Sequence, residues 1–198
     1  AVVDHRLVWI VDGYTVTRNY PNSEAVSLRQ AITDAETPAD PTKDQSINYM
    51  RNSVKAVVDA TDGTVKLYAW DPSDPILQTY DKVFPGTLTS ADEISPDLRA
   101  HLRYPSDLFK VQRQMLTRYH MTDPNSWYQQ SDLWQVPADP VASMPGQPET
   151  TQSSAAEPPY YLSIKWPGDS APVFSQTAVF VPYNRQNLAS YLSVVAEA

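Results

Sequence analysis

Apolar and polar residues alternate with a period of two in the first part of the chain, which is typical of β-strands with one buried face. Residues 6–11 (RLVWIV) and 14–19 (YTVTRN) flank an Asp-Gly pair at positions 12 and 13. Because Asp-Gly favours a two-residue hairpin turn, this pattern predicts a first β-hairpin. In that hairpin Trp9 lies opposite Val16.

A second alternating pair follows at residues 53–60 (SVKAVVDA) and 64–70 (TVKLYAW), around another Asp-Gly pair. A two-residue turn at this pair predicts a second hairpin in which small and aliphatic residues share one face. On the other face, Lys55 lies opposite Trp70 as a cation–aromatic pair.

The spacing of apolar residues then changes to three and four, which predicts helices. Proline marks the start of each one: we expect helices from Pro75, from Pro96 and from Pro105, the last ending near Met121. The third helix is the longest. Its apolar stripe, and therefore its expected buried face, consists of Leu108, Phe109, Met115, Leu116 and Tyr119.

Residues 137–159 contain six prolines and almost no large apolar side chain, which predicts a flexible loop. Strand patterns return at 160–166 and 173–181. Residues 187–192 have a helical pattern, and 193–196 begin a further strand. We expect the late strands to join the sheet of the second hairpin.

The predicted fold class is therefore α+β, with two N-terminal β-hairpins, a central segment of two to three helices and C-terminal antiparallel strands. We expect a single domain overall. Residues 1–136 form the hairpins and the helical segment, 137–159 form the proline-rich loop, and 160–198 return to the same domain.

Composition narrows the classes of function. The formal net charge is −8 with only 15 Lys and Arg. This charge argues against a nucleic-acid-binding protein and against a polybasic segment that binds anionic lipid. Cysteine is absent from the sequence, so disulfides and thiolate chemistry are excluded. Stretches long and apolar enough to span a bilayer are missing too. A start at Ala1 rather than Met is expected of a processed protein or of an excised piece.

Several segments resemble a large uncharacterised family of bacterial multi-pass integral membrane proteins. They are 10–23 (IVDGYTVTRNYPNS), 47–71 (INYMRNSVKAVVDATDGTVKLYAWD), 74–86 (DPILQTYDKVFPG), 97–124 (DLRAHLRYPSDLFKVQRQMLTRYHMTDP), 126–137 (SWYQQSDLWQVP) and 179–194 (VFVPYNRQNLASYLSV). The resemblance implies that this chain is part of a large extracytoplasmic domain at the cell membrane, with the transmembrane part of its own parent as a partner. It implies no activity and no catalytic residue.

The densest polar cluster in the sequence offers two interpretations. Arginine and histidine side chains of this kind bind phosphate or carboxylate ligands, and they also cap helix ends by donating to the last carbonyl oxygens. Both interpretations stay open. The candidate ligand-binding residues are Arg99, His101, Arg103, Tyr104, Arg118 and His120.

The sequence favours a protein that is not an enzyme. Histidine pairs at metal-ligand spacing, a nucleophile elbow and a glycine-rich phosphate loop are all missing, so we expect no catalytic residue, no metal site and no cofactor. The leading hypothesis is a ligand-binding or protein-interaction module that receives an envelope ligand. The alternatives are a cell-envelope hydrolase with His101 or His120 as base, and a structural spacer in a larger ectodomain.

Overall fold

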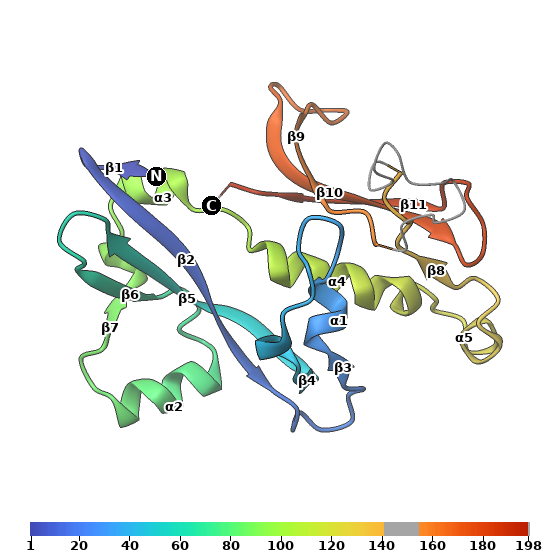
Figure 1. The fold of residues 1–198 in the computed structure, drawn as a ribbon, viewed down its shortest axis with the longest axis horizontal. Coiled ribbons are helices and arrows are strands. Elements are labelled where there is room, and N and C mark those ends of the chain that lie inside the picture. The colour runs from blue at the N-terminus through green and yellow to red at the C-terminus, as the bar shows by residue number, and fades with distance from the viewer. Residues whose placement is uncertain (141–154, 198) are drawn as a thin grey trace. The chain divides into compact units, whose positions relative to one another are not determined.

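The computed structural model describes residues 1–140 and 155–197, and its contacts divide the chain into two compact units (Figure 1). Unit 1 comprises Ala1–Ala25, Ile47–Leu108 and Glu197–Ala198, and unit 2 comprises Val26–Ser46 and Phe109–Ala196. Each unit is therefore assembled from segments that are far apart in the sequence. Most of the predicted proline-rich loop, residues 141–154, lies outside the described residues.

Unit 1 is built on a five-stranded sheet in the order β1-β2-β5-β6-β7. The strands are β1 (Val2–Val3), β2 (Arg6–Thr17), β5 (Tyr49–Asp59), β6 (Val65–Ala69) and β7 (Leu88–Ser90). Neighbouring strands are antiparallel except β6 and β7, which are parallel and joined through helix α2 (Pro75–Val83). The α+β class is thus confirmed.

The first predicted hairpin is wrong, because residues 6–17 form the single long strand β2, which pairs along its length with β5. Gly13 lies at an irregularity in this pairing rather than in a turn. A Cβ atom at Gly13 would lie 3.0 Å from the Cβ of Val54, so glycine here permits close approach of two strands. Asp12 is held by the ammonium of Lys55 on β5. Pairing with a distant strand has overridden the local turn signal.

The second hairpin is confirmed, but its register differs from the prediction by two residues. Lys55 lies opposite Tyr68 rather than Trp70. The loop is longer than two residues because Asp59 N–H donates to the Thr64 carbonyl and Gly63 adopts a φ of +74°. A shift of two preserves which side chains share a face, and Lys55 Nζ still lies 5.6 Å from the centroid of the Trp70 ring.

One face of the unit 1 sheet is covered by α3 (Pro96–His101), which begins where the sequence predicted and is capped by the Ser95 hydroxyl. Leu98 and Leu102 pack there against Val8 of β2 and Tyr68 of β6, and all four are buried. A short 3-10 turn, Ala91–Glu93, precedes this helix. This cluster is the hydrophobic core of unit 1.

Unit 2 contains a second sheet in which β10 (Val173–Pro182) is central. It pairs with β9 (Tyr160–Ile164) and β8 (Trp134–Gln135) along one edge and with β11 (Ser190–Val195) along the other, all antiparallel. The C-terminal antiparallel strands are confirmed, whereas their expected pairing with the second hairpin is wrong. The helix predicted at 187–192 is also wrong, because the second half of this segment, from Ser190 on, pairs with the edge of β10 as the start of β11.

The helices assigned mainly to unit 2 are α1 (Leu28–Ile32), α4 (Ser106–Tyr119) and α5 (Pro124–Gln129), with a 3-10 turn at Pro41–Lys43. A short ribbon pairs β3 (Val26–Ser27) with β4 (Ser46–Ile47). The expected buried face of α4 is partly confirmed: Phe109 is buried, Leu108, Met115 and Leu116 are half-buried, and Tyr119 is exposed. The helix also buries Lys110, Val111, Arg113 and Thr117, which the sequence did not predict. The helix buries charge because partners from other segments reach it.

Candidate functional site

The structure places Arg99, His101, Arg103 and Tyr104 in unit 1, around the end of α3. His101 Nδ1 lies 2.8 Å from the carbonyl oxygen of Asp97, and Arg103 donates to the carbonyls of Ala100 and Leu102 at 2.8 Å each. The Arg99 guanidinium lies over the Trp70 ring, 5.6 Å from its centroid. The contacts of His101 and Arg103 are those expected of helix-capping side chains, whereas Arg99 stacks on an aromatic ring.

Arg118 and His120 belong to unit 2, so the six candidates are divided between two units. Arg118 lies over the Trp127 ring at 5.3 Å. His120 stacks on Trp134 with ring centroids 3.5 Å apart, and its nitrogens lie 2.7 Å and 2.8 Å from the carbonyl oxygens of Leu116 and Asp132. Capping and stacking account for these contacts, and a ligand-binding role for the six residues stays a prediction.

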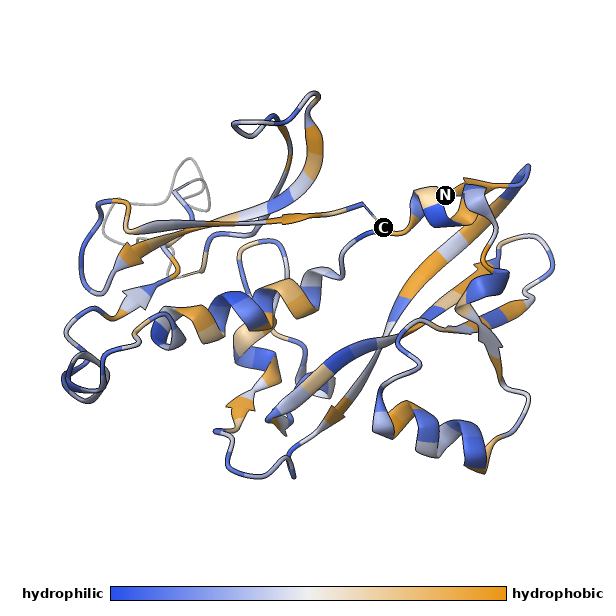
Figure 2. Cartoon of the chain, turned by 180° about the vertical axis from the view of Figure 1, so that it is seen from behind, coloured by the Kyte–Doolittle hydropathy of each residue, from blue (hydrophilic) through white to orange (hydrophobic). Residues whose placement is uncertain are grey.

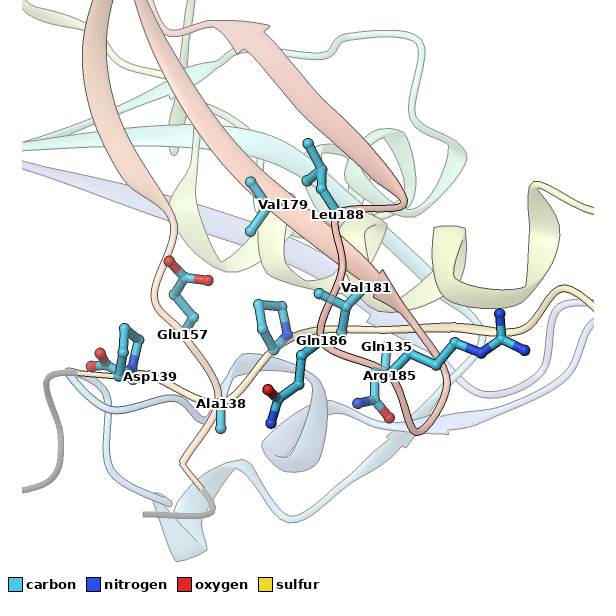
Figure 3. A pocket seen from close by; sticks show the side chains of 11 residues that line it. Gln135, Ala138, Asp139, Glu157, Val179, Val181, Arg185, Gln186 and Leu188 are labelled. Atoms are coloured by element: carbon cyan, nitrogen blue, oxygen red, sulfur yellow. The ribbon is translucent and has the colours of Figure 1, made fainter. Parts of the chain in front are cut away.

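A different feature of unit 2 has the form of a binding site. A cavity of about 690 Å³ opens between the strand end at β8, the residues around Glu157, and the turn that joins β10 to β11 (Figure 3). Ligand pockets in proteins commonly have volumes of about 300–1,000 Å³. The lining residues are Gln135, Pro137, Ala138, Asp139, Pro140, Glu157, Val179, Val181, Arg185, Gln186 and Leu188.

The cavity has an apolar wall and polar groups at two sides. Val179 and Val181 of β10, together with Leu188 of the turn, supply the apolar wall. In Figure 3 the carboxylates of Asp139 and Glu157 lie on one side, and the amide groups of glutamines lie on the other. This arrangement can hold a molecule with an aliphatic body and hydrogen-bonding groups at its ends.

The walls of the cavity are held by a short antiparallel ribbon that pairs Ala138 with Ala156. Asp139 N–H donates to the Ala155 carbonyl at 3.0 Å, and Glu157 N–H donates to the Pro137 carbonyl at 2.9 Å. The two ends of the segment predicted as a loop, 137–159, therefore pair with each other. Since backbone hydrogen bonds fix them, the lining residues they carry are positioned before any ligand arrives.

Glu157 connects the cavity to the interior of unit 2. Its carboxylate accepts a 2.7 Å hydrogen bond from the Tyr160 hydroxyl, and its carbonyl accepts one from the Arg113 guanidinium, also at 2.7 Å. Burial, together with the hydrogen bond to Glu157, raises the pKa of Tyr160 to about 12. Burial also lowers the pKa of Arg113, although the charges of Asp34 and Glu157 oppose this. Arg113 thus supports the cavity wall from behind.

Next to Arg113 on α4, Lys110 is buried and forms an ion pair with Asp34, with Nζ and Oδ2 2.6 Å apart. It also donates to the Thr37 hydroxyl at 2.7 Å and contacts the Ile32 carbonyl at 3.3 Å. Backbone N–H groups of Glu36 and Thr37 donate to the other carboxylate oxygen of Asp34. This buried ion pair has a structural role, because it joins α4 to the 26–46 segment.

Unit 1 contains its own buried polar group at Asp74, which caps α2 and is fully buried. Its carboxylate accepts hydrogen bonds from the hydroxyls of Thr15, Ser53 and Tyr49 and from Ile76 N–H. Burial alone would raise the pKa of Asp74, but these hydrogen bonds outweigh burial and lower it. Burial and the bond to Asp74 raise the pKa of Tyr49 to about 12. This network fastens α2 to the sheet.

Within residues 1–140 and 155–197, the structure shows no group of three or more His, Asp or Glu side chains arranged to hold a metal ion. Over the same residues, no helix has the length and apolar character needed to cross a membrane.

The cavity could not be found from the sequence, because its lining comes from three separate segments, 135–140, 157 and 179–188, that only the fold brings together. Several of its residues lie in the proline-rich stretch that was assigned to a loop. Both nearby strand patterns, at 160–166 and 173–181, follow that stretch, and the two-residue strand β8 before it is too short to show a pattern. No sequence pattern therefore indicated that the two ends of the stretch meet.

Taken together, the fold and site define an α+β protein with a small-molecule-sized cavity. The chain belongs to the uncharacterised protein family UPF0182, whose sequence profile matches residues 1–198.

Several proteins similar to this chain carry the same family name. UPF0182 proteins from Thermobifida fusca and Streptomyces coelicolor are 50% and 49% identical to this chain over its whole length, and one from Tropheryma whipplei is 48% identical. The chain spans only 19 to 22% of the length of these relatives. A comparison with solved structures finds no match.

Proposed function

We propose that this chain is the ligand-binding part of a longer membrane protein, exposed on the extracytoplasmic face, and that the cavity of unit 2 holds the ligand. The observation that carries the proposal is the cavity itself, with its size, its apolar wall and its backbone-fixed rim. The length of the relatives supports a longer parent. The resemblance to multi-pass membrane proteins supports its location.

The chemistry of the lining indicates an amphipathic ligand. Val179, Val181 and Leu188 favour an aliphatic body, because burying it removes apolar surface from water. The amides of Gln135 and Gln186 both donate and accept, which suits amide or hydroxyl groups on the ligand. Asp139 and Glu157 give one side an acidic character that disfavours an anionic group there.

A hydrolase is the competing function, and the geometry at His120 argues against it. A general base needs a ring nitrogen with a free lone pair within reach of the nucleophile. Both nitrogens of His120 are directed at carbonyl oxygens. Neither His101 nor His120 lines the cavity.

The binding proposal is tested by ligand-observed NMR with a library of aliphatic amides, alcohols and amines. We expect a subset of compounds to give saturation-transfer signals and to raise the melting temperature. The variant Leu188→Asp should abolish these signals, because it places a charge on the apolar wall. Tyr183→Asp is the matched control, since Tyr183 is also exposed near the same turn but does not line the cavity.

Two results would contradict the proposal. One is the absence of any signal across the library at millimolar ligand. The other is binding that Leu188→Asp and Tyr183→Asp weaken equally, which would locate it elsewhere on the chain.

A further inference from the structure

One face of the unit 1 sheet is apolar and largely uncovered. Alternate residues of β2 point to this face, and the exposed fractions of Leu7, Trp9 and Val11 are 57%, 69% and 51%. Figure 2 shows that hydrophobic residues recur along β2. Isolated exposed apolar residues are normal in proteins, but a regular row of them on one strand is not.

The row continues onto the neighbouring strands. Val58 of β5 lies opposite Trp9, and Val65 of β6 lies opposite Val58, with 56% of Val65 exposed. Leu67 follows two positions along β6 and shares the face. We call Leu7, Trp9, Val11, Val58, Val65 and Leu67 the β2 face. It crosses three adjacent strands and contains no charged side chain among these six.

This face is distinct from the core of unit 1. The core lies on the opposite side of the same strands, where Val8 and Tyr68 pack against α3. A sheet with apolar side chains on both faces is typical of sheets covered on both sides. The strands of unit 1 are therefore suited to a second covering layer.

The length of the relatives points to the occupant. Each relative is about five times as long as this chain, and the match covers the whole of this chain but only 19% of the relative. The formal net charge of −8 makes an anionic lipid surface a poor partner. The β2 face consists of aliphatic side chains and one tryptophan and is uncharged, so an apolar polypeptide surface is the partner that complements it.

We propose that the β2 face is an interface covered by an apolar surface of the longer polypeptide, outside these 198 residues. This inference rests on the proposed function only in taking the chain to be part of a longer protein. It does not depend on the cavity, which belongs to unit 2. The β2 face then joins unit 1 to the remainder of its parent, as the layers of a domain are joined.

The test compares thiol accessibility at two adjacent positions of β6. Val65 belongs to the β2 face, whereas Lys66 is exposed and points to the other side of the sheet. Because the chain has no cysteine, Val65→Cys and Lys66→Cys each introduce a single thiol. Maleimide labelling rates are measured for both variants in the 198-residue chain and in the longer protein freed of other cysteines. Circular dichroism checks that both variants fold.

We expect both thiols to react at similar rates in the 198-residue chain. In the longer protein, labelling of Val65→Cys should slow by about tenfold or more, because a covered site reacts only during local opening. Lys66→Cys should keep its rate. Equal rates at the two positions in the longer protein would overturn the proposal.

Other occupants give different patterns, each of which also overturns it. Slow labelling of Val65→Cys already in the monomeric 198-residue chain would show that another part of this chain covers the β2 face. Protection that grows with chain concentration would indicate a second copy, and protection only with zwitterionic phospholipid vesicles would indicate lipid. A native protein of 22.2 kDa on an immunoblot would refute the longer parent, independently of any result on cavity binding.

Discussion

At the scale of single residues, Asp74 shows how a short side chain can connect distant segments. The Asp-Pro pair at positions 74 and 75 indicates a helix start, and Asp74 does cap α2. The sequence does not indicate that the same carboxylate also accepts from Thr15 of β2 and Ser53 of β5. Those hydroxyls lie far away in the chain, so the buried network exists only after the sheet has formed.

We predict that Asp74→Asn destabilises the chain by about 2–3 kcal/mol, because a buried carboxylate with several hydrogen bonds is replaced by a neutral amide with unmatched donors. The measurement is urea denaturation at pH 7. Asp81→Asn, at an exposed position of the same helix, is the control and should change stability by less than about 0.5 kcal/mol. Equal effects of the two substitutions would show that the network contributes nothing specific.

The same carboxylate should make stability depend on pH. Folding lowers the pKa of Asp74, so its contribution is complete above the unfolded value of about 3.9 and is lost as pH falls through the folded value. The difference between the original chain and Asp74→Asn should therefore shrink below about pH 4. A difference that stays constant with falling pH would contradict this assignment.

At the scale of elements, the strand β2 shows where local pattern is insufficient. Asp-Gly favours a turn at positions 12 and 13, yet residues 6–17 remain extended because β5 supplies a partner for the whole length. The same signal near Gly63 does form a turn, since Gly63 adopts a positive φ there. Two identical dipeptides therefore adopt different conformations, and the difference lies in what the flanking strands can pair with.

We predict that Val11→Cys with Ala56→Cys forms an intramolecular disulfide under mild oxidation. The two residues are partners across β2 and β5, and opposite residues in antiparallel strands have Cα atoms about 4.5–5.5 Å apart, within the range a disulfide spans. Free-thiol titration should find no remaining thiol. The control pair Trp9→Cys with Val16→Cys would be opposite in the hairpin alternative, but within one strand its Cα atoms lie about 23 Å apart. Formation of an intramolecular disulfide by the control pair would show that residues 6–19 form a hairpin instead of one strand.

At the scale of the whole molecule, the two units are interleaved along the chain. Unit 2 combines residues 26–46 with 109–196, and the joint between these segments includes the Asp34–Lys110 ion pair. Ala35 N–H adds a hydrogen bond to the Ala156 carbonyl at 2.9 Å. Lys110 appears in the sequence as a polar residue on a helix that was expected to bury only its apolar stripe. Its burial depends on a partner 76 positions away.

We predict that Lys110→Met costs about 3–5 kcal/mol, because it leaves the buried carboxylate of Asp34 without its cation. Adding Asp34→Leu should recover part of this loss, so the double variant is more stable than the sum of the single effects implies. Urea denaturation followed by tryptophan fluorescence measures all three. Lys66→Met, at an exposed position, is the control. Strict additivity would show that the two charges do not act as a pair.

The sequence by itself determined the α+β class, the starts of the three central helices, the second hairpin and the strands at 160–166 and 173–181. These features depend on residues a few positions apart, where proline, caps and period-two or period-four patterns act directly. Only the tertiary structure decided the pairing of β2 with β5, the separate C-terminal sheet, the burial of Lys110 and Arg113, and the cavity beside Glu157. Each of these requires a partner tens of residues away, and the free energy of meeting that partner exceeds the local preference.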